Sequence, residues 1–83
     1  MDHTHLDYEL ECIGKILSNL RDENDDKLET VAKATELDES TISRIEHGEY
    51  LPLRLDMISK LANYYGKKID DILPPNMQLH RAI

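Results

Sequence analysis

Apolar residues near the start of the chain recur with the period of an α-helix. They follow one another at steps of four, three, four and three residues, at Leu6, Leu10, Ile13, Leu17 and Leu20. This spacing places all five side chains on one face of a helix. The segment from about residue 5 to about residue 23 is therefore predicted to be an amphipathic helix whose apolar face needs a partner surface. Thr4, followed by Asp7, is a weak form of the signal that caps such a helix.

Further helices are predicted at about residues 27–35, 39–47, 53–65 and 69–73, where the same period returns. Asp26 followed by Glu29 is a capping signal for the second helix, and Asp38 is a favourable N-cap for the third. Gly48 stands where a glycine commonly ends a helix, and Pro74 stops the last one. No stretch alternates with the two-residue period of a strand. The fold class expected from the pattern is all-α.

The predicted core is aliphatic, because the chain contains neither Phe nor Trp. Gly14, within the first helix, is expected to permit close packing by another helix. Such a core leaves no room for a large apolar ligand cavity. The inward positions expected after the first helix are Leu28, Val31, Ala32, Thr35, Ile42, Ile45, Leu55, Ile58, Leu61, Ala62, Ile69, Ile72 and Leu73.

A chain of 83 residues is expected to form one domain, residues 1–83, with a core at 13–73 and a short tail at 74–83. The tail carries Met77, Leu79 and Ile83 without a clear period. Acids outnumber bases by 17 to 10, which gives a net charge of −7. This balance argues against strong nucleic-acid binding, since phosphate contacts need Lys and Arg. Contacts are local, however, and salt screens charges beyond about 10 Å.

Several function classes have little support in the sequence. One cysteine, Cys12, makes no internal disulfide, and with His3 and His5 it is too few ligands to predict a metal site. No glycine-rich phosphate loop and no nucleophile with a base indicates an enzyme, and no cofactor is expected. No apolar run approaches the roughly 20 residues that cross a membrane. Residues 1–10 are acidic and polar, unlike a signal peptide, so a cytoplasmic protein is expected.

A motif in the middle of the chain resembles a known family. Val31-Ala32, Leu37, the run Ser40-Thr41-Ile42-Ser43-Arg44-Ile45-Glu46-His47-Gly48 and Pro52 are similar to the phage-repressor/Cro, or XRE-type, helix-turn-helix family. The resemblance extends over about Ile13 to Leu73. It implies a five-helix, lambda-repressor-like domain whose second and third helices form the helix-turn-helix. The third would enter the major groove of double-stranded DNA, while the amides that begin the second face a phosphate.

The resemblance also assigns residues to this task. Arg44 suits a bidentate pair with guanine, and Ser or Thr hydroxyls bond several bases. Arg21, at the end of the first helix, and Glu46, at the end of the third, match a structural ion pair of the family. The candidate DNA-binding residues are Glu39, Ser40, Thr41, Ser43, Arg44, Lys27, His47 and Arg54.

The sequence departs from the family pattern in ways that leave two functions open. Leu28 stands where many members have a phosphate-binding glutamine, Glu36 where the turn usually has glycine, and Asp25 and Asp26 where glycine and an apolar residue are usual. From Lys27 to Arg54 there are four bases and six acids. One hypothesis is a sequence-specific transcriptional regulator, a homodimer on a palindromic operator, paired through its last two helices and its tail. The alternative is an acidic protein-interaction module with a basic protein partner, antitoxin-like, with weak or no DNA binding.

Overall fold

The computed structural model describes residues 4–49 and 53–74, and this part of the chain consists of five helices without a strand. The all-α, five-helix prediction is therefore confirmed, with helix ends that shift by one or two residues. The expected Thr4–Asp7 cap, the tail residues Met77, Leu79 and Ile83, and the motif residue Pro52 lie outside the described side chains. The helices are α1 Thr4–Asn24, α2 Leu28–Thr35, α3 Glu39–Glu46, α4 Leu55–Tyr64 and α5 Ile69–Ile72.

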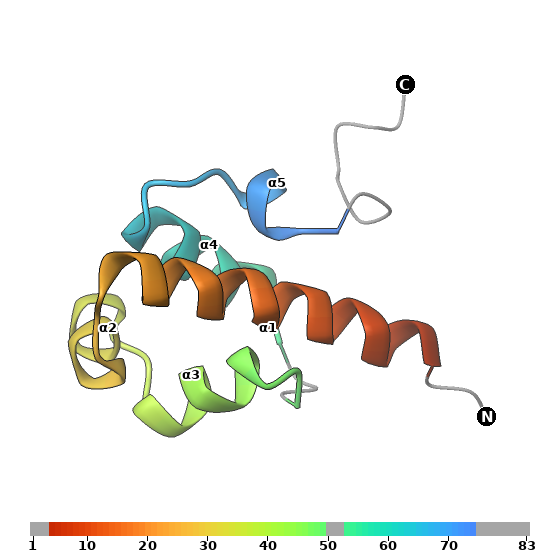
Figure 1. The fold of residues 1–83 in the computed structure, drawn as a ribbon, viewed down its shortest axis with the longest axis horizontal. Coiled ribbons are helices and arrows are strands. Elements are labelled where there is room, and N and C mark those ends of the chain that lie inside the picture. The colour runs from red at the N-terminus through yellow and green to blue at the C-terminus, as the bar shows by residue number, and fades with distance from the viewer. Residues whose placement is uncertain (1–3, 50–52, 75–83) are drawn as a thin grey trace.

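The long helix α1 organises the fold (Figure 1). It packs against α3 on one side and against α5 on another, while α2 contacts both α3 and α4, and α4 contacts α5. The N-terminal turns of α1 extend beyond the other helices (Figure 1). The central stretch of α1 is thus covered from both sides, and α3 is held at the edge of the bundle with one face toward solvent.

The core is the aliphatic cluster that the sequence predicts, with one exception. Leu55 is 51% exposed, although its place in the apolar stripe of the fourth helix predicted an inward side chain. The reason is that α4 begins at Leu55, after an extended residue at Arg54, so the preceding Leu53 packs against the core instead. The buried residues of the cluster are Ile13, Leu17, Val31, Ile42, Ile45, Ile58, Leu61, Ala62, Ile72 and Leu73.

Two glycines fix how α3 meets α1. A Cβ added to Gly14 would lie 2.7 Å from the carbonyl oxygen of Glu46 and closer still to that of Ile45, so α3 lies directly on this residue. The close packing expected at Gly14 is confirmed. Gly48 follows α3 with φ +71°, and its N–H donates to the carbonyl of Ile45 at 3.0 Å. This left-handed ending matches the predicted C-terminal glycine. It lies directly against α1, because a Cβ added to Gly48 would be 2.9 Å from the Cα of Glu11.

The predicted capping of α2 by Asp26 is wrong. Lys27 occupies the N-cap position, and no side chain in the described part caps the helix. The Asp26 carboxylate instead accepts a hydrogen bond from the Tyr64 hydroxyl at 2.7 Å. Asp38 does stand at the N-cap of α3, as predicted, yet its side chain makes no capping bond within the described residues.

Candidate nucleic-acid interface

The helix α3 has one buried face and one face open to solvent. Ile42 and Ile45 are 1% and 2% exposed and fix the helix on the core. The open face combines exposed and half-buried polar side chains, which are those of Glu39, Ser40, Thr41, Ser43, Arg44 and His47. A short helix that is anchored by two isoleucines and offers hydroxyls and a guanidinium outward is suited to reading the edges of bases.

The turn before α3 contains a residue in a left-handed conformation. Glu36 has φ +63°, a conformation that glycine adopts without strain and that most side chains avoid. Its side chain is exposed, and Leu37 after it packs against the core. The turn geometry usual with glycine is therefore kept, and the carboxylate of Glu36 is placed at the corner between α2 and α3.

The start of α2 carries one candidate residue and lacks another that the family often has there. Lys27 is exposed at the N-cap. Leu28, at the position often taken by glutamine, packs against the core near fully buried Val31. Its apolar side chain offers no hydrogen bond to a phosphate, so any backbone contact at this helix end falls to Lys27 and the main-chain amides.

Arg54 and His47 are held by local contacts. The Arg54 guanidinium lies 3.2 Å from the Asp56 carboxylate, and both side chains are more than half exposed, so this pair contributes little stability. The Nδ1 atom of His47 lies 2.7 Å from the Ser43 carbonyl oxygen. Since a carbonyl only accepts, the proton of a neutral His47 ring sits on Nδ1. The exposed Arg54–Asp56 pair is too weak to prevent a phosphate from competing for the guanidinium.

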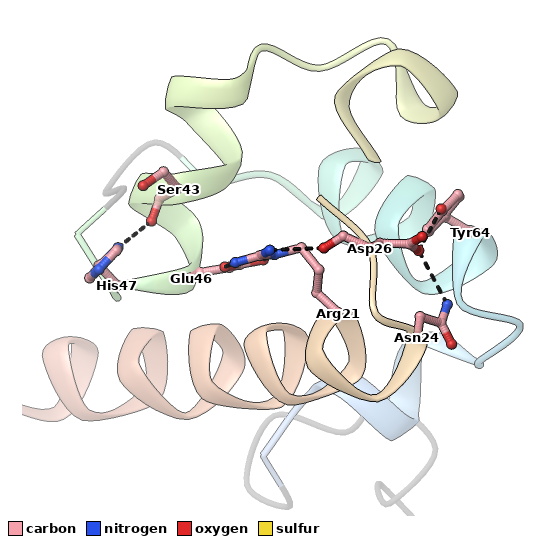
Figure 2. Close-up of polar contacts among 7 residues, drawn as sticks. All are labelled: Arg21, Asn24, Asp26, Ser43, Glu46, His47 and Tyr64. Atoms are coloured by element: carbon pink, nitrogen blue, oxygen red, sulfur yellow. Dashed lines mark hydrogen bonds and ion pairs between the residues drawn. The ribbon is translucent and has the colours of Figure 1, made fainter. Parts of the chain in front are cut away.

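An ion pair ties α1 to the end of α3 (Figure 2). Arg21 donates from Nε and Nη2 to the two carboxylate oxygens of Glu46, at 2.8 and 3.0 Å. The Glu46 side chain is 6% exposed and that of Arg21 23%. This bonding to Glu46 raises the pKa of Arg21 above its ordinary value, against the opposing effect of burial. These are the two residues that the family resemblance pairs.

The same arginine begins a longer network that the sequence did not predict. Its Nη1 donates to the backbone carbonyl of Asp26 at 3.0 Å, and the Asp26 carboxylate accepts from the Tyr64 hydroxyl, as Figure 2 shows. The bond to Asp26 raises the pKa of Tyr64. The network thus connects α3, α1, the segment before α2, and α4. Asp26 and Tyr64 are 38 residues apart, and no local pattern indicates such a pair.

A second tyrosine beside this network has no hydrogen bond. The hydroxyl of Tyr65 is buried without a partner among the described residues, and its ring packs edge-on against Tyr64 at a centroid distance of 5.0 Å. Burial raises the pKa of the Tyr65 phenol, nearby Glu46 acts in the same direction, and Arg21 opposes it. No pattern in the sequence distinguishes the bonded hydroxyl of Tyr64 from the unbonded hydroxyl of Tyr65.

Other surface features bear less directly on this interface. A shallow depression of about 370 Å³ lies between α2 and α4, lined by Ala34, Thr35, Glu36, Lys60, Asn63 and Tyr64. Within the described ranges, no group of three or more His, Cys, Asp or Glu side chains is arranged to hold a metal ion. No helix among the described residues is long and apolar enough to span a membrane.

A family model described as helix-turn-helix matches residues 17–72, which is more than half of the chain. The match begins within α1 and ends at the last residue of α5, so it includes α2, the turn at Glu36 and α3. The comparison with curated proteins and the comparison with solved structures returned no match.

Proposed function

As a member of the XRE-type helix-turn-helix family, this chain is a DNA-binding regulator, and we propose that it acts as a sequence-specific transcriptional regulator. It binds a short palindromic operator as a homodimer, with α3 of each copy in the major groove. In this arrangement the two recognition helices lie about one turn of DNA apart, ~34 Å.

The observation that carries the proposal is the polar outer face of α3. Its buried isoleucines and the contact at Gly14 hold the helix rigidly, which is what readout of base edges requires. Arg44 is the proposed reader of guanine, and Ser40, Thr41, Ser43 and Glu39 are proposed to contact neighbouring base edges. Lys27, His47 and Arg54 are proposed to contact the phosphate backbone at the rim of this surface. Arg21 and Glu46 do not touch DNA in this proposal and instead hold α3 on α1.

The proposed dimer surface lies on the side of α4 and α5. Support comes from Leu55 on α4, which is a large apolar side chain left 51% exposed in one copy of the chain. Burial of such a residue against a second copy is favourable, since removing apolar surface from water contributes roughly 25 cal/mol per Å². Sedimentation analysis of the wild-type chain tests the pairing, and a monomer at all concentrations would rule it out.

The DNA-binding proposal is tested by selection from a pool of randomised duplexes. The wild-type chain is expected to enrich a common palindromic sequence and to bind it in competition with random duplex. Arg44→Ala is expected to lose about 1–3 kcal/mol of discrimination at one base pair of each half-site. Lys33→Ala, which removes an exposed cation on α2 outside the proposed readers, is the matched control and should leave discrimination unchanged.

The second candidate function is an acidic protein-interaction module, and a specific observation favours it. Glu29, Glu36, Asp38 and Glu39 are all exposed on or beside the helix-turn-helix, where they would repel phosphates. A basic protein partner would be attracted to the same surface. If selection enriches no sequence even at low salt, while a basic partner binds at this surface, the second function replaces the first.

A further inference from the structure

We infer that Tyr64 and Asp26 are positioning residues of the DNA-binding surface: through their side-chain bond, α4 holds the segment before α2 and so fixes α2 relative to α3. This inference rests on the proposed function, since it concerns the surface proposed to meet DNA. It assigns a role in binding to two residues that do not themselves belong to that surface.

The segment that joins α1 to α2 is held by side chains of α1 and α4. Asp25 has φ +58°, so the chain turns sharply here without a glycine. The next residue is held from two sides, because Arg21 bonds its carbonyl at 3.0 Å and Tyr64 bonds its carboxylate at 2.7 Å. Lys27, directly after it, begins α2 without a side-chain cap of its own. The two bonds to Asp26 therefore act at the start of α2, in addition to the packing of Leu28 and Val31 in the core.

The segment before α2 is linked through Arg21 to the proposed recognition helix α3. The guanidinium that bonds the Asp26 carbonyl also bonds both carboxylate oxygens of Glu46 at the end of α3. One planar group thus relates the start of α2 to the end of α3 (Figure 2). The family resemblance accounts for the Arg21–Glu46 pair, but it does not account for the bonds from Arg21 and Tyr64 to Asp26. Those bonds extend the ion pair to α4.

The fixed placement of α2 relative to α3 has a consequence for DNA binding. α2 and α3 must contact the backbone and the bases of DNA at the same time, so freedom between them has to be removed when the complex forms. A protein that already holds the two helices in place binds more tightly without making any new contact. The Tyr64–Asp26 bond supplies this preorganisation, and a Phe at position 64 would keep the ring while releasing the carboxylate.

The test measures DNA affinity with the duplex that the wild-type chain selects from a randomised pool. Tyr64→Phe is expected to bind this duplex more weakly, by up to about tenfold, the limit set by the net contribution of one hydrogen bond. The salt dependence should stay unchanged, because every phosphate contact is still made in the complex. Lys27→Ala, by contrast, should reduce the salt slope of the homodimer by about 2, because each of the two copies loses one phosphate contact. Tyr8→Phe, which removes a hydroxyl from an exposed tyrosine on α1, is the matched control and should bind like wild type.

The partner residue makes the test specific to the bond. Asp26→Asn retains an oxygen that accepts from Tyr64, so its affinity should remain near that of wild type, whereas Asp26→Ala should resemble Tyr64→Phe. In the Asp26→Ala background, Tyr64→Phe should have no further effect. Circular dichroism and unfolding midpoints establish that each variant is folded at the temperature of measurement.

The possible outcomes separate the two proposals. If folded Tyr64→Phe binds like wild type, or if its effect is the same with and without Asp26, the inference is wrong while the proposed function stands. If the wild-type chain selects no duplex, the proposed function fails and the inference fails with it.

Discussion

The neighbouring residues Tyr64 and Tyr65 differ in whether the hydroxyl has a hydrogen-bond partner. The Tyr64 hydroxyl donates to Asp26, whereas that of Tyr65 is buried with no partner among the described residues. Leaving a buried polar group unsatisfied costs free energy that its removal recovers. Tyr65→Phe is therefore expected to raise the free energy of unfolding by about 1 kcal/mol. Urea unfolding measures this, with Tyr64→Phe as the matched variant that should lose stability. A loss of stability in Tyr65→Phe would show that its hydroxyl does find a partner.

Tyr65 also makes the free energy of unfolding depend on pH in the alkaline range. Burial raises the pKa of the folded Tyr65 phenol, whereas in the unfolded chain the phenol has its ordinary pKa of about 10. Above that pH the unfolded chain releases a proton that the folded chain retains. The free energy of unfolding must then fall as pH rises through about 10. Unfolding measured at about pH 8 and about pH 11 should show a smaller decline in Tyr65→Phe than in wild type. Equal declines would mean that Tyr65 titrates normally.

At the scale of helices, the contact of α1 with α3 depends on the missing side chain of Gly14. A Cβ there would collide with the carbonyl oxygens of Ile45 and Glu46, which are backbone atoms and cannot rotate away. Gly14→Ala should therefore destabilise the fold by about 1–3 kcal/mol, although Ala favours a helix. Asn19→Ala, at an exposed position of the same helix, is the control and should not destabilise. Thermal unfolding compares the two, and a stabilised Gly14→Ala would contradict the packing described.

The helices also show what the sequence could and could not predict. Their number, order and buried faces follow from a period that each segment carries within itself, so the prediction needed no knowledge of the other segments. Asp26 was wrongly predicted to cap α2, because the residue that binds it, Tyr64, is distant in sequence and approaches only after α4 packs. Leu55 was wrongly predicted to be buried. Its spacing matches the apolar stripe, but α4 begins only at Leu55, two residues later than predicted, and the side chain stays exposed. Patterns within each segment predict the helices, whereas hydrogen bonds between helices can be identified only once the fold is known.

The candidate site was predictable in outline for a related reason. The outward residues of α3 follow directly from which positions face inward, at Ile42 and Ile45. The sequence does not reveal that Asp26 and Tyr64 join the Arg21–Glu46 pair in one network, nor that these bonds anchor the segment before α2. The left-handed turn at Glu36 is a feature that the motif predicts only in part. The motif indicated a tight turn, and the structure keeps its geometry with a non-glycine residue at φ +63°.

The whole molecule combines a helix-turn-helix with a net charge of −7, and this combination limits how it can bind DNA. Each copy places three exposed Lys and Arg residues at the proposed interface, which are Lys27, Arg44 and Arg54. Each phosphate that a cation neutralises contributes about 0.9 to the slope of log binding constant against log salt concentration. In a homodimer these cations set an upper limit of about 5 for the magnitude of the slope, which is reached only if Arg44 meets a phosphate as well as a base. Fluorescence anisotropy with the selected duplex over a series of KCl concentrations measures it. A steeper slope would show that cations other than Lys27, Arg44 and Arg54 reach the backbone. Because so few cations attract DNA of any sequence, affinity for random duplex should be weak, and discrimination must come from the base-reading face of α3.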